Sequence, residues 1–223
     1  TSSFVDELAV AAGRDPLEYQ LDLLGPARLL DLSAAGLGDY WNYGVSPELY
    51  PYDIGRLRRV LEVAAERAGW GRRRSGNGWG MGLAVARSFT AYVASVVEVE
   101  VSTQGVVRVP RITQVIDCGI VVNPERVRAQ LEGAAVMAVG LARSGEITAA
   151  NGRVQQGNFN DFSVARITDA PVQVDAHIIE SNEKPGGVGE PGLPPVVPAL
   201  TNAIFAATGR RVRDLPLSRH GLS

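Results

Sequence analysis

The sequence predicts an α+β fold, in which a helical lead-in up to about residue 75 precedes a mixed β-sheet packed with two main helices. Apolar residues recur at helical spacing before residue 70 and alternate with polar residues after residue 80, as they do in strands. With 223 residues, 45% of them hydrophobic and 21% charged, the chain can bury a large core. We therefore expect two units, residues 1–75 and residues 76–223.

Capping residues predict three helices in the lead-in. Serine or aspartate precedes each apolar repeat, and a proline occupies the first position of the second helix. The expected helices begin after Ser3, Asp15 and Asp53, and glycine ends the first at Gly13 and the third at Gly69. The third is expected over residues 54–68, whereas the Gly-, Pro- and Tyr-rich residues 25–52 are expected to form an irregular connection.

Alternating segments predict the strands of the sheet. The expected strands are MGLAVARSF (81–89), ASVVEVEVS (94–102), VVRVPRITQVID (106–117) and APVQVDAHIIES (170–181). A TQG turn joins the second strand to the third. We expect the polar face of this sheet to be either exposed to water or covered by other elements.

The segment that follows the third strand is expected to be a long helix. Asn123 and Pro124 cap and start it, and the pattern continues to about residue 142. Its middle, from Gly133 to Gly140, contains almost nothing larger than valine or methionine. We therefore expect a bulky element to pack close to this part of the helix.

The rest of the chain is expected to contain a hairpin, a second helix and a short tail strand. Asn151 and Gly152 form a pair that favours a tight hairpin turn. Beyond Pro198 an apolar helix is expected up to Gly209, and RRVRDLPL (210–217) is expected to be the tail strand.

Charge and cysteine content exclude several classes of protein. Lys and Arg number 22 against 24 Asp and Glu, so no overall basic field favours nucleic acid, and GRRRSG (71–76) is expected to be a solvated loop. No apolar run approaches the roughly 20 residues of a membrane helix. The single cysteine, Cys118, cannot build an iron–sulfur or zinc site by itself, and its apolar surroundings predict a buried, inert thiol. The histidines, His177 and His220, are too far apart in sequence to suggest a ligand set.

The loop KPGGVGEPGLPP (184–195) is the strongest candidate for a functional site. It places one carboxylate, Glu190, among glycines and prolines, with no Lys or Arg from residue 186 to residue 208. The spacing from Gly187 to Gly192 also matches a dinucleotide-binding fingerprint, but Pro191 and the prolines after Leu193 remove the amides that would bind a pyrophosphate. Two interpretations of Glu190 remain: a solvent-facing residue in a structural loop, or a rigidly held, poorly hydrated general base.

The segment from residue 186 to residue 217, GGVGEPGLPPVVPALTNAIFAATGRRVRDLPL, resembles the C-terminal signature of the molybdenum hydroxylases, the xanthine oxidase and aldehyde oxidoreductase family. The resemblance is greatest to the large (beta) subunits of the isoquinoline 1-oxidoreductase type. It continues through DCGIVVNPERVRAQLEGA and GEITAANGRVQQGNFNDF and reaches SFVDELAVAAGRDPLEYQLDLL, so it extends over essentially the whole chain.

This resemblance implies a molybdenum-dependent hydroxylation of an N-heterocycle or aldehyde carbon, with oxygen from water. The glutamate matching Glu190 is the general base that deprotonates a hydroxyl carried by molybdenum. The glutamine matching Gln130 contacts the pterin cofactor, whose edge its amide can both donate to and accept from. Gly187, Val188 and Gly189 match the loop that passes close to the cofactor.

The resemblance also implies cofactors and partners. The cofactor is molybdopterin, expected in its cytosine dinucleotide form, and the [2Fe-2S] clusters reside on a small partner subunit. The family's glycine-glutamine-glycine loop is not found in this sequence, which starts TSSFVDELAV without an initiator Met, so we expect the rest of the large subunit to be a second partner. A different hypothesis is a non-catalytic assembly domain that binds no cofactor on its own.

Overall fold

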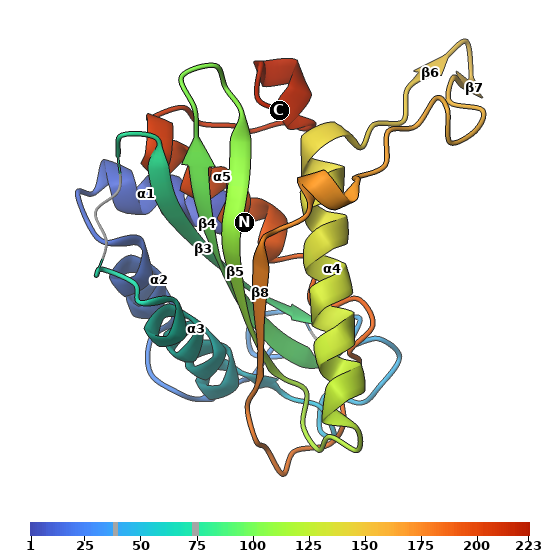
Figure 1. Cartoon of the computed structure of the whole chain (residues 1–223). Helices are drawn as coiled ribbons and strands as arrows, with labels where there is room; N and C mark the ends of the chain where they lie inside the picture. The colour runs from blue at the N-terminus through green and yellow to red at the C-terminus, as the bar shows by residue number, and fades with distance from the viewer. Residues whose placement is uncertain (38–39, 73–75) are drawn as a thin grey trace.

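A four-stranded mixed sheet lies at the centre of the computed structural model, which describes residues 1–37, 40–72 and 76–223 (Figure 1). Its strands, in spatial order, are β3 (Trp79–Ser88), β4 (Ala91–Val101), β5 (Val107–Asp117) and β8 (Gln173–Ile178). The first three are antiparallel neighbours, and β8 runs parallel to β5. The predicted α+β class and the mixed sheet are therefore confirmed.

The lead-in contains the three expected helices, α1 (Ser2–Ala11), α2 (Pro16–Leu24) and α3 (Ile54–Ala68). Asp15 and Asp53 cap α2 and α3 as predicted, because each carboxylate accepts hydrogen bonds from amides of the first turn. The prediction for Ser3 is wrong: α1 begins two residues before the expected start, Thr1 occupies the N-cap position, and the Ser3 hydroxyl lies 3.3 Å from that of Thr201.

The expected irregular connection before α3 contains a small strand pair. It consists of β1 (Leu29–Leu30) and β2 (Tyr52–Asp53), which run antiparallel. The expected domain boundary near residue 75 and half of the basic loop GRRRSG fall on residues 73–75, outside the described residues. The division into two units stays a prediction.

Two long helices follow the central strands. Helix α4 (Pro124–Ser144) begins after the Asn123 cap, as predicted, and connects β5 to β8. Helix α5 (Val196–Thr208) begins three residues before the expected start and ends at Gly209, which has the left-handed φ of +74°. The expected turn at Asn151 and Gly152 joins β6 (Ala149–Ala150) to β7 (Arg153–Val154), in a hairpin that projects from the body of the molecule (Figure 1).

Only one end of the small-residue segment of α4 is closely packed. A Cβ added to Gly140 would lie 2.8 Å from the Cβ of Ala165, whereas one added to Gly133 would meet nothing within 4 Å. Val136 and Met137, between them, are 37% and 59% exposed. The expected bulky neighbour is therefore absent at Gly133 among the described residues, and this face of α4 presents apolar side chains to solvent.

The C-terminal tail is not the expected strand. Residues 210–216 have no regular structure and lead into the 3₁₀ helix η2 (Leu217–His220). The arginines of the tail form ion pairs with α1 instead, Arg211 with Asp6 and Arg213 with Glu7. Pro216 lacks a backbone donor, which also disfavours a strand.

Helices cover both faces of the sheet, so of the two alternatives for its polar face the covered one is correct. Apolar side chains of α3 pack against one face, together with Leu83, Val96 and Val115 of the strands. Helices α4 and α5 pack against the other face. Helix α5 comes closest at β3, where a Cβ on Gly82 would lie 2.2 Å from the carbonyl oxygen of Ala199.

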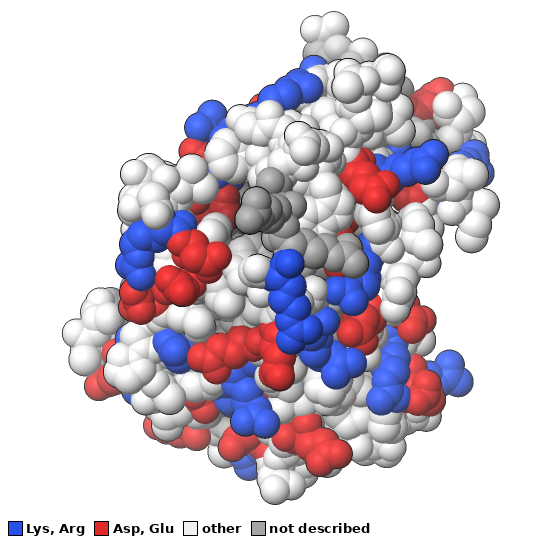
Figure 2. All heavy atoms as spheres, turned by 60° about the vertical axis from the view of Figure 1, so that its left-hand side comes forward, with Lys and Arg blue, Asp and Glu red and all other residues white. Residues whose placement is uncertain are grey.

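Charges of both signs are interspersed over the surface. On the face that carries the lead-in helices, Lys and Arg side chains alternate with Asp and Glu (Figure 2). This face therefore shows no continuous basic surface of the kind that binds nucleic acid. Within the described residues, no helix combines the length and the apolar character needed to cross a bilayer.

The close contact between β3 and α5 predicts a large effect of adding one methyl group. We expect Gly82→Ala to lower the free energy of unfolding by about 1–3 kcal/mol, because its Cβ would meet the backbone of α5. We expect the same change in open space, Gly133→Ala, to raise it by up to about 1 kcal/mol through helix propensity. Urea denaturation of both variants measures the difference, and an unaffected Gly82→Ala variant would contradict the packing described.

Candidate functional site

The glycine loop between β8 and α5 is tied to two turns at one end of the sheet. The amide of Gly186 donates to the carbonyl of Cys118, just after β5, at 2.8 Å. The amide of Gly187 donates to the carbonyl of Phe89, in the β3–β4 turn, also at 2.8 Å. The hydroxyl of Tyr50 donates to the carbonyl of Pro185 at 3.1 Å. These bonds fix the path of the loop before it reaches Glu190.

Glycine is required at two positions where the loop and the neighbouring turns come close together. Gly119 has a φ of +73°, and a Cβ on it would lie 2.2 Å from the carbonyl oxygen of Lys184. A Cβ on Gly187 would lie 2.7 Å from the Cβ of Phe89. Gly187 therefore has a packing reason for being glycine, and its predicted cofactor contact stays a prediction.

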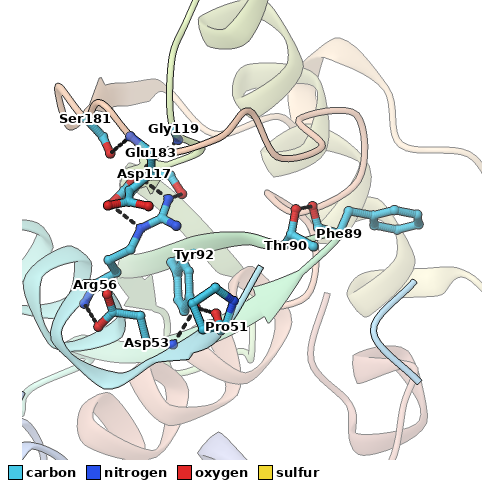
Figure 3. A network of polar contacts seen from close by, with 10 residues as sticks. All are labelled: Pro51, Asp53, Arg56, Phe89, Thr90, Tyr92, Asp117, Gly119, Ser181 and Glu183. Atoms are coloured by element: carbon cyan, nitrogen blue, oxygen red, sulfur yellow. Dashed lines mark hydrogen bonds and ion pairs between the residues drawn. The ribbon is translucent and has the colours of Figure 1, made fainter. Parts of the chain in front are cut away.

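A buried ion pair supports the turn after β5 (Figure 3). The guanidinium of Arg56, on α3, binds both carboxylate oxygens of Asp117 at 2.7 and 2.8 Å and lies over the ring of Tyr92. Asp117 also accepts the amide of Gly119 at 3.1 Å. Because the Asp117 side chain is only 4% exposed, removing Arg56 would leave a buried carboxylate without its cation.

A buried amide holds the far end of the loop. The side-chain nitrogen of Gln114, on β5, donates to the carbonyl of Gly192 at 2.6 Å and to the hydroxyl of Ser95 at 3.1 Å. The amide of Leu193 donates to the carbonyl of Glu190 at 3.0 Å, which closes a turn around Glu190. The segment from Gly186 to Leu193 is thus held at both ends by hydrogen bonds.

The structure brings the predicted site residues of the loop and of α4 together. Gln130 is exposed on α4, and its side-chain nitrogen lies 3.7 Å from the position of a Cβ on Gly189. Val188 is half-buried against the apolar cluster beneath α4, while Gly189 and Glu190 are exposed. The roles predicted for these residues remain predictions, but their proximity is a property of the fold.

The expectation of a poorly hydrated Glu190 is wrong for this chain. Its carboxylate is exposed, and within the described ranges it has no hydrogen-bond or ion-pair partner. The physical reason is the direction of the turn. Pro191 and Gly192 are buried on the side that faces β5 and α4, whereas Glu190 lies on the outer side of the turn. The loop is rigidly anchored, but nothing in the described chain covers the carboxylate.

Other sequence candidates do not assemble into a site. The described residues contain no group of three or more His, Cys, Asp or Glu side chains that could hold a metal ion. His220 contacts the carbonyl of Asp214 at 3.0 Å, and burial, followed by the charge of Arg67, lowers the pKa of His177. Cys118 is 2% exposed, and burial, followed by the charge of Asp117, raises its pKa to about 11. The predicted inert thiol agrees with this environment.

Sequence reasoning missed Arg56, Asp117 and Gln114. The signal for Gln114 was a lone amide between Ile112 and Ile116 on the inward face of a strand. No comparable signal exists for Arg56 and Asp117, because 61 residues separate them and their pairing depends on the packing of α3.

Comparisons with known proteins give a consistent pattern. The family model of a molybdopterin cofactor-binding domain matches residues 63–171. The isoquinoline 1-oxidoreductase subunit beta of Brevundimonas diminuta is 33% identical over 96% of this chain and 24% of its own length. The membrane-bound aldehyde dehydrogenase of Gluconacetobacter polyoxogenes, named with pyrroloquinoline-quinone, is 33% identical over 96% of this chain and 26% of its own length.

A solved structure shows the same fold over part of the chain. The aldehyde oxidoreductase of Desulfovibrio gigas superposes on 56% of this chain and 14% of its own, with a TM-score of 0.50 and 26% identity. This chain spans about a quarter of the length of the two sequence relatives, which it matches at 24% and 26% coverage.

The environment of Cys118 predicts slow alkylation of the folded chain. At pH 8 a thiol with a pKa of about 11 has about 100-fold less thiolate than one at the ordinary value of 9.0. We expect iodoacetamide to modify the native chain at least 100-fold more slowly than the urea-unfolded chain, as measured by mass spectrometry.

The same shift has a consequence for stability. Because folding raises the pKa of Cys118, the neutral thiol contributes to the free energy of unfolding in full below pH 9. This contribution is lost as the pH rises from 9 towards 11, because the thiol of the unfolded chain ionises at lower pH than that of the folded chain.

Equal alkylation rates in the folded and unfolded chains would contradict the burial of Cys118.

Proposed function

The chain belongs to the molybdenum hydroxylase family, and from this premise we propose that it contributes the general base and part of the cofactor-binding surface of a molybdopterin-dependent oxidoreductase. The proposed reaction is the hydroxylation of an electron-poor carbon of an N-heterocycle or an aldehyde, with oxygen from water. The observation that carries the proposal is the anchored loop, which exposes Glu190 and places its neighbour Gly189 beside Gln130 of α4.

The residues around the loop fit a cofactor with a hydrogen-bonding edge. Within the described part of the chain, the amides of Val188, Gly189 and Glu190 donate no hydrogen bond, and neither does the side chain of Gln130. Gly189, Glu190 and Gln130 are exposed and Val188 is half-buried, on a surface that the surrounding turns hold in place. Gln130 and the amides of residues 188–189 would hold the pterin, since a pterin edge offers several acceptors and its phosphates offer more.

Glu190 is the proposed proton acceptor. When bound, the molybdenum cofactor supplies the two-electron oxidation and the activation of the oxygen that derives from water. The Glu190 carboxylate has no competing partner within the described ranges, so it is free to accept a proton from a group placed against the outer side of the loop. The anchors at Gly186, Gly187 and Gly192 keep the backbone that carries Glu190 in one position during this transfer.

The exposure of Glu190 supports a partner that covers it. The sequence relatives are about four times as long as this chain, which matches 24–26% of them. We propose that a further part of such a large subunit lies over the loop, completes the cofactor site and excludes water from Glu190. Substrate selection would then depend mainly on that part.

Electron transfer requires another partner. Cys118 is the single cysteine of the sequence, and it is buried, so this chain supplies no ligand set for an iron–sulfur cluster. We propose that a small subunit carries the [2Fe-2S] clusters that accept the electrons, and that the cofactor is the cytosine dinucleotide form of molybdopterin.

The proposal predicts a selective loss of turnover on changing Glu190. In a complex of this chain with the remainder of the large subunit and the small subunit, we expect Glu190→Gln to lower kcat by about 10²–10⁴-fold. Molybdenum content should stay unchanged, because the amide has the size of the carboxylate and the loop anchors are untouched. Steady-state kinetics with isoquinoline and an aldehyde, together with elemental analysis, measure both quantities.

Glu66→Gln is the matched control, because Glu66 is exposed on α3 at the opposite end of the helix from Arg56. It should retain the parental activity. Turnover by Glu190→Gln at the parental rate would show that Glu190 is not the base. A stable complex that holds no molybdenum would favour the assembly hypothesis, and one that holds a quinone instead would contradict the proposed cofactor.

The proposed role of Gln130 predicts an effect on cofactor retention. We expect Gln130→Ala to lower the molybdenum content of the purified complex several-fold, because it removes the side chain that lies beside Gly189. Glu132→Ala, two residues further along α4 and therefore exposed on a different side of the helix, is the control and should retain the metal. Equal metal contents in the two variants would remove Gln130 from the cofactor site.

A further inference from the structure

We propose that Gln114 is a positioning residue for Glu190, which it holds in place through the carbonyl of Gly192. The inference rests on the role proposed for Glu190, since it concerns how that carboxylate is oriented. Gln114 is fully buried and does not reach the outer surface of the loop, so it acts through the backbone and not on the substrate.

The hydrogen-bond geometry connects Gln114 to the turn that contains Glu190. The side-chain nitrogen of Gln114 has two protons, and it directs them to the carbonyl of Gly192 at 2.6 Å and the hydroxyl of Ser95 at 3.1 Å. Gly192 lies inside the turn closed by the 3.0 Å bond from the Leu193 amide to the Glu190 carbonyl. Fixing the Gly192 peptide therefore fixes the orientation of the turn that carries the Glu190 side chain.

The position of Gln114 in the core is costly for stability. Gln114 and Ser95 are opposite each other in the register of β4 and β5, and both are 0% exposed. They lie between the apolar cluster containing Val97 and Ile112 and the one containing Val93 and Ile116. Within the described residues the side-chain oxygen of Gln114 has no hydrogen-bond partner. An apolar pair would fill this gap without that penalty, so stability alone does not account for the amide.

The same bond also sets the distance between the loop and α4. A Cβ on Gly192 would lie 3.0 Å from the side chains of both Leu131 and Ala134, so the loop is pressed against the helix at this point. Gln130 precedes Leu131 on that helix. Gln114 holds Gly192 through a hydrogen bond from β5. It thereby fixes the distance between the loop that carries Glu190 and the helix that carries Gln130.

Gln114→Met tests the proposal, because methionine has a similar volume but neither donor. In the chain itself we expect the hydrogen-bonded amides of this segment, those of Gly186, Gly187 and Leu193, to exchange with deuterium at least about 10-fold faster, measured by mass spectrometry of the corresponding peptide. In the assembled complex we expect kcat to fall about 10–100-fold, with KM and molybdenum content within twofold of the parent. Gln114→Asn, which keeps the amide but is one methylene shorter, should give the same two results and replaces Gln114→Met should that variant not fold.

Asn202→Leu is the matched control for the loss of a buried amide. Asn202 is 2% exposed, donates to the carbonyl of Leu83 at 3.1 Å, and also has a side-chain oxygen without a partner in the described ranges. It lies on α5 against β3 and makes no hydrogen bond to the loop. We expect its Tm to change as much as that of Gln114→Met, with loop exchange and kcat unchanged.

The outcomes separate this inference from the proposed function. Unchanged exchange of residues 186–193 in Gln114→Met would overturn the positioning role, and so would an equal loss of kcat in Asn202→Leu. The exchange measurement needs no cofactor, so it tests the anchor even if Glu190→Gln keeps full activity. That last result would overturn the proposed function instead.

Discussion

The structure of the candidate site depends on the hydrogen bonds that β5 and the turn after it make to the glycine loop. The loop has no regular secondary structure, and its prolines leave it few donors of its own. It is held from outside, by the carbonyl of Cys118 at its entry and by the side chain of Gln114 at its exit. Strand β5 and the residue after it thus help to hold both ends of the segment, and the strand is paired on both sides.

The helical lead-in contributes to the same support. Arg56 of α3 reaches the end of β5, where it binds Asp117 and stacks over Tyr92, whose hydroxyl also accepts the amide of Asp53. Because Asp117 accepts the amide of Gly119 as well, the ion pair joins α3, β5 and the turn into one polar unit in an otherwise apolar region. The buried charges are tolerated because each has several partners, and the arrangement specifies how α3 docks on the sheet.

Local signals in the sequence predicted most of the elements, whereas long-range contacts decided the rest. The caps Asp15, Asp53 and Asn123 act on amides within three residues, so their effect can be read from the sequence. The tail was mistaken for a strand because the ion pairs of Arg211 and Arg213 with α1 join opposite ends of the chain. The hydration of Glu190 could not be predicted for the same reason: it depends on which surface covers the loop and not on the residues beside it.

The parallel pairing of β8 with β5 has a consequence for how the molecule is made. Strands β3, β4 and β5 are joined by consecutive hairpins and can pair with their neighbours in the sequence. Strand β8 can pair only after the chain has passed through α4, and in this pairing Arg111 lies opposite Gln173. Closing such a long connection is slow compared with hairpin formation. During synthesis the strand that carries Gln114 is therefore made well before the glycine loop, which can meet it only after α4 and β8 and is itself followed by α5 and the tail.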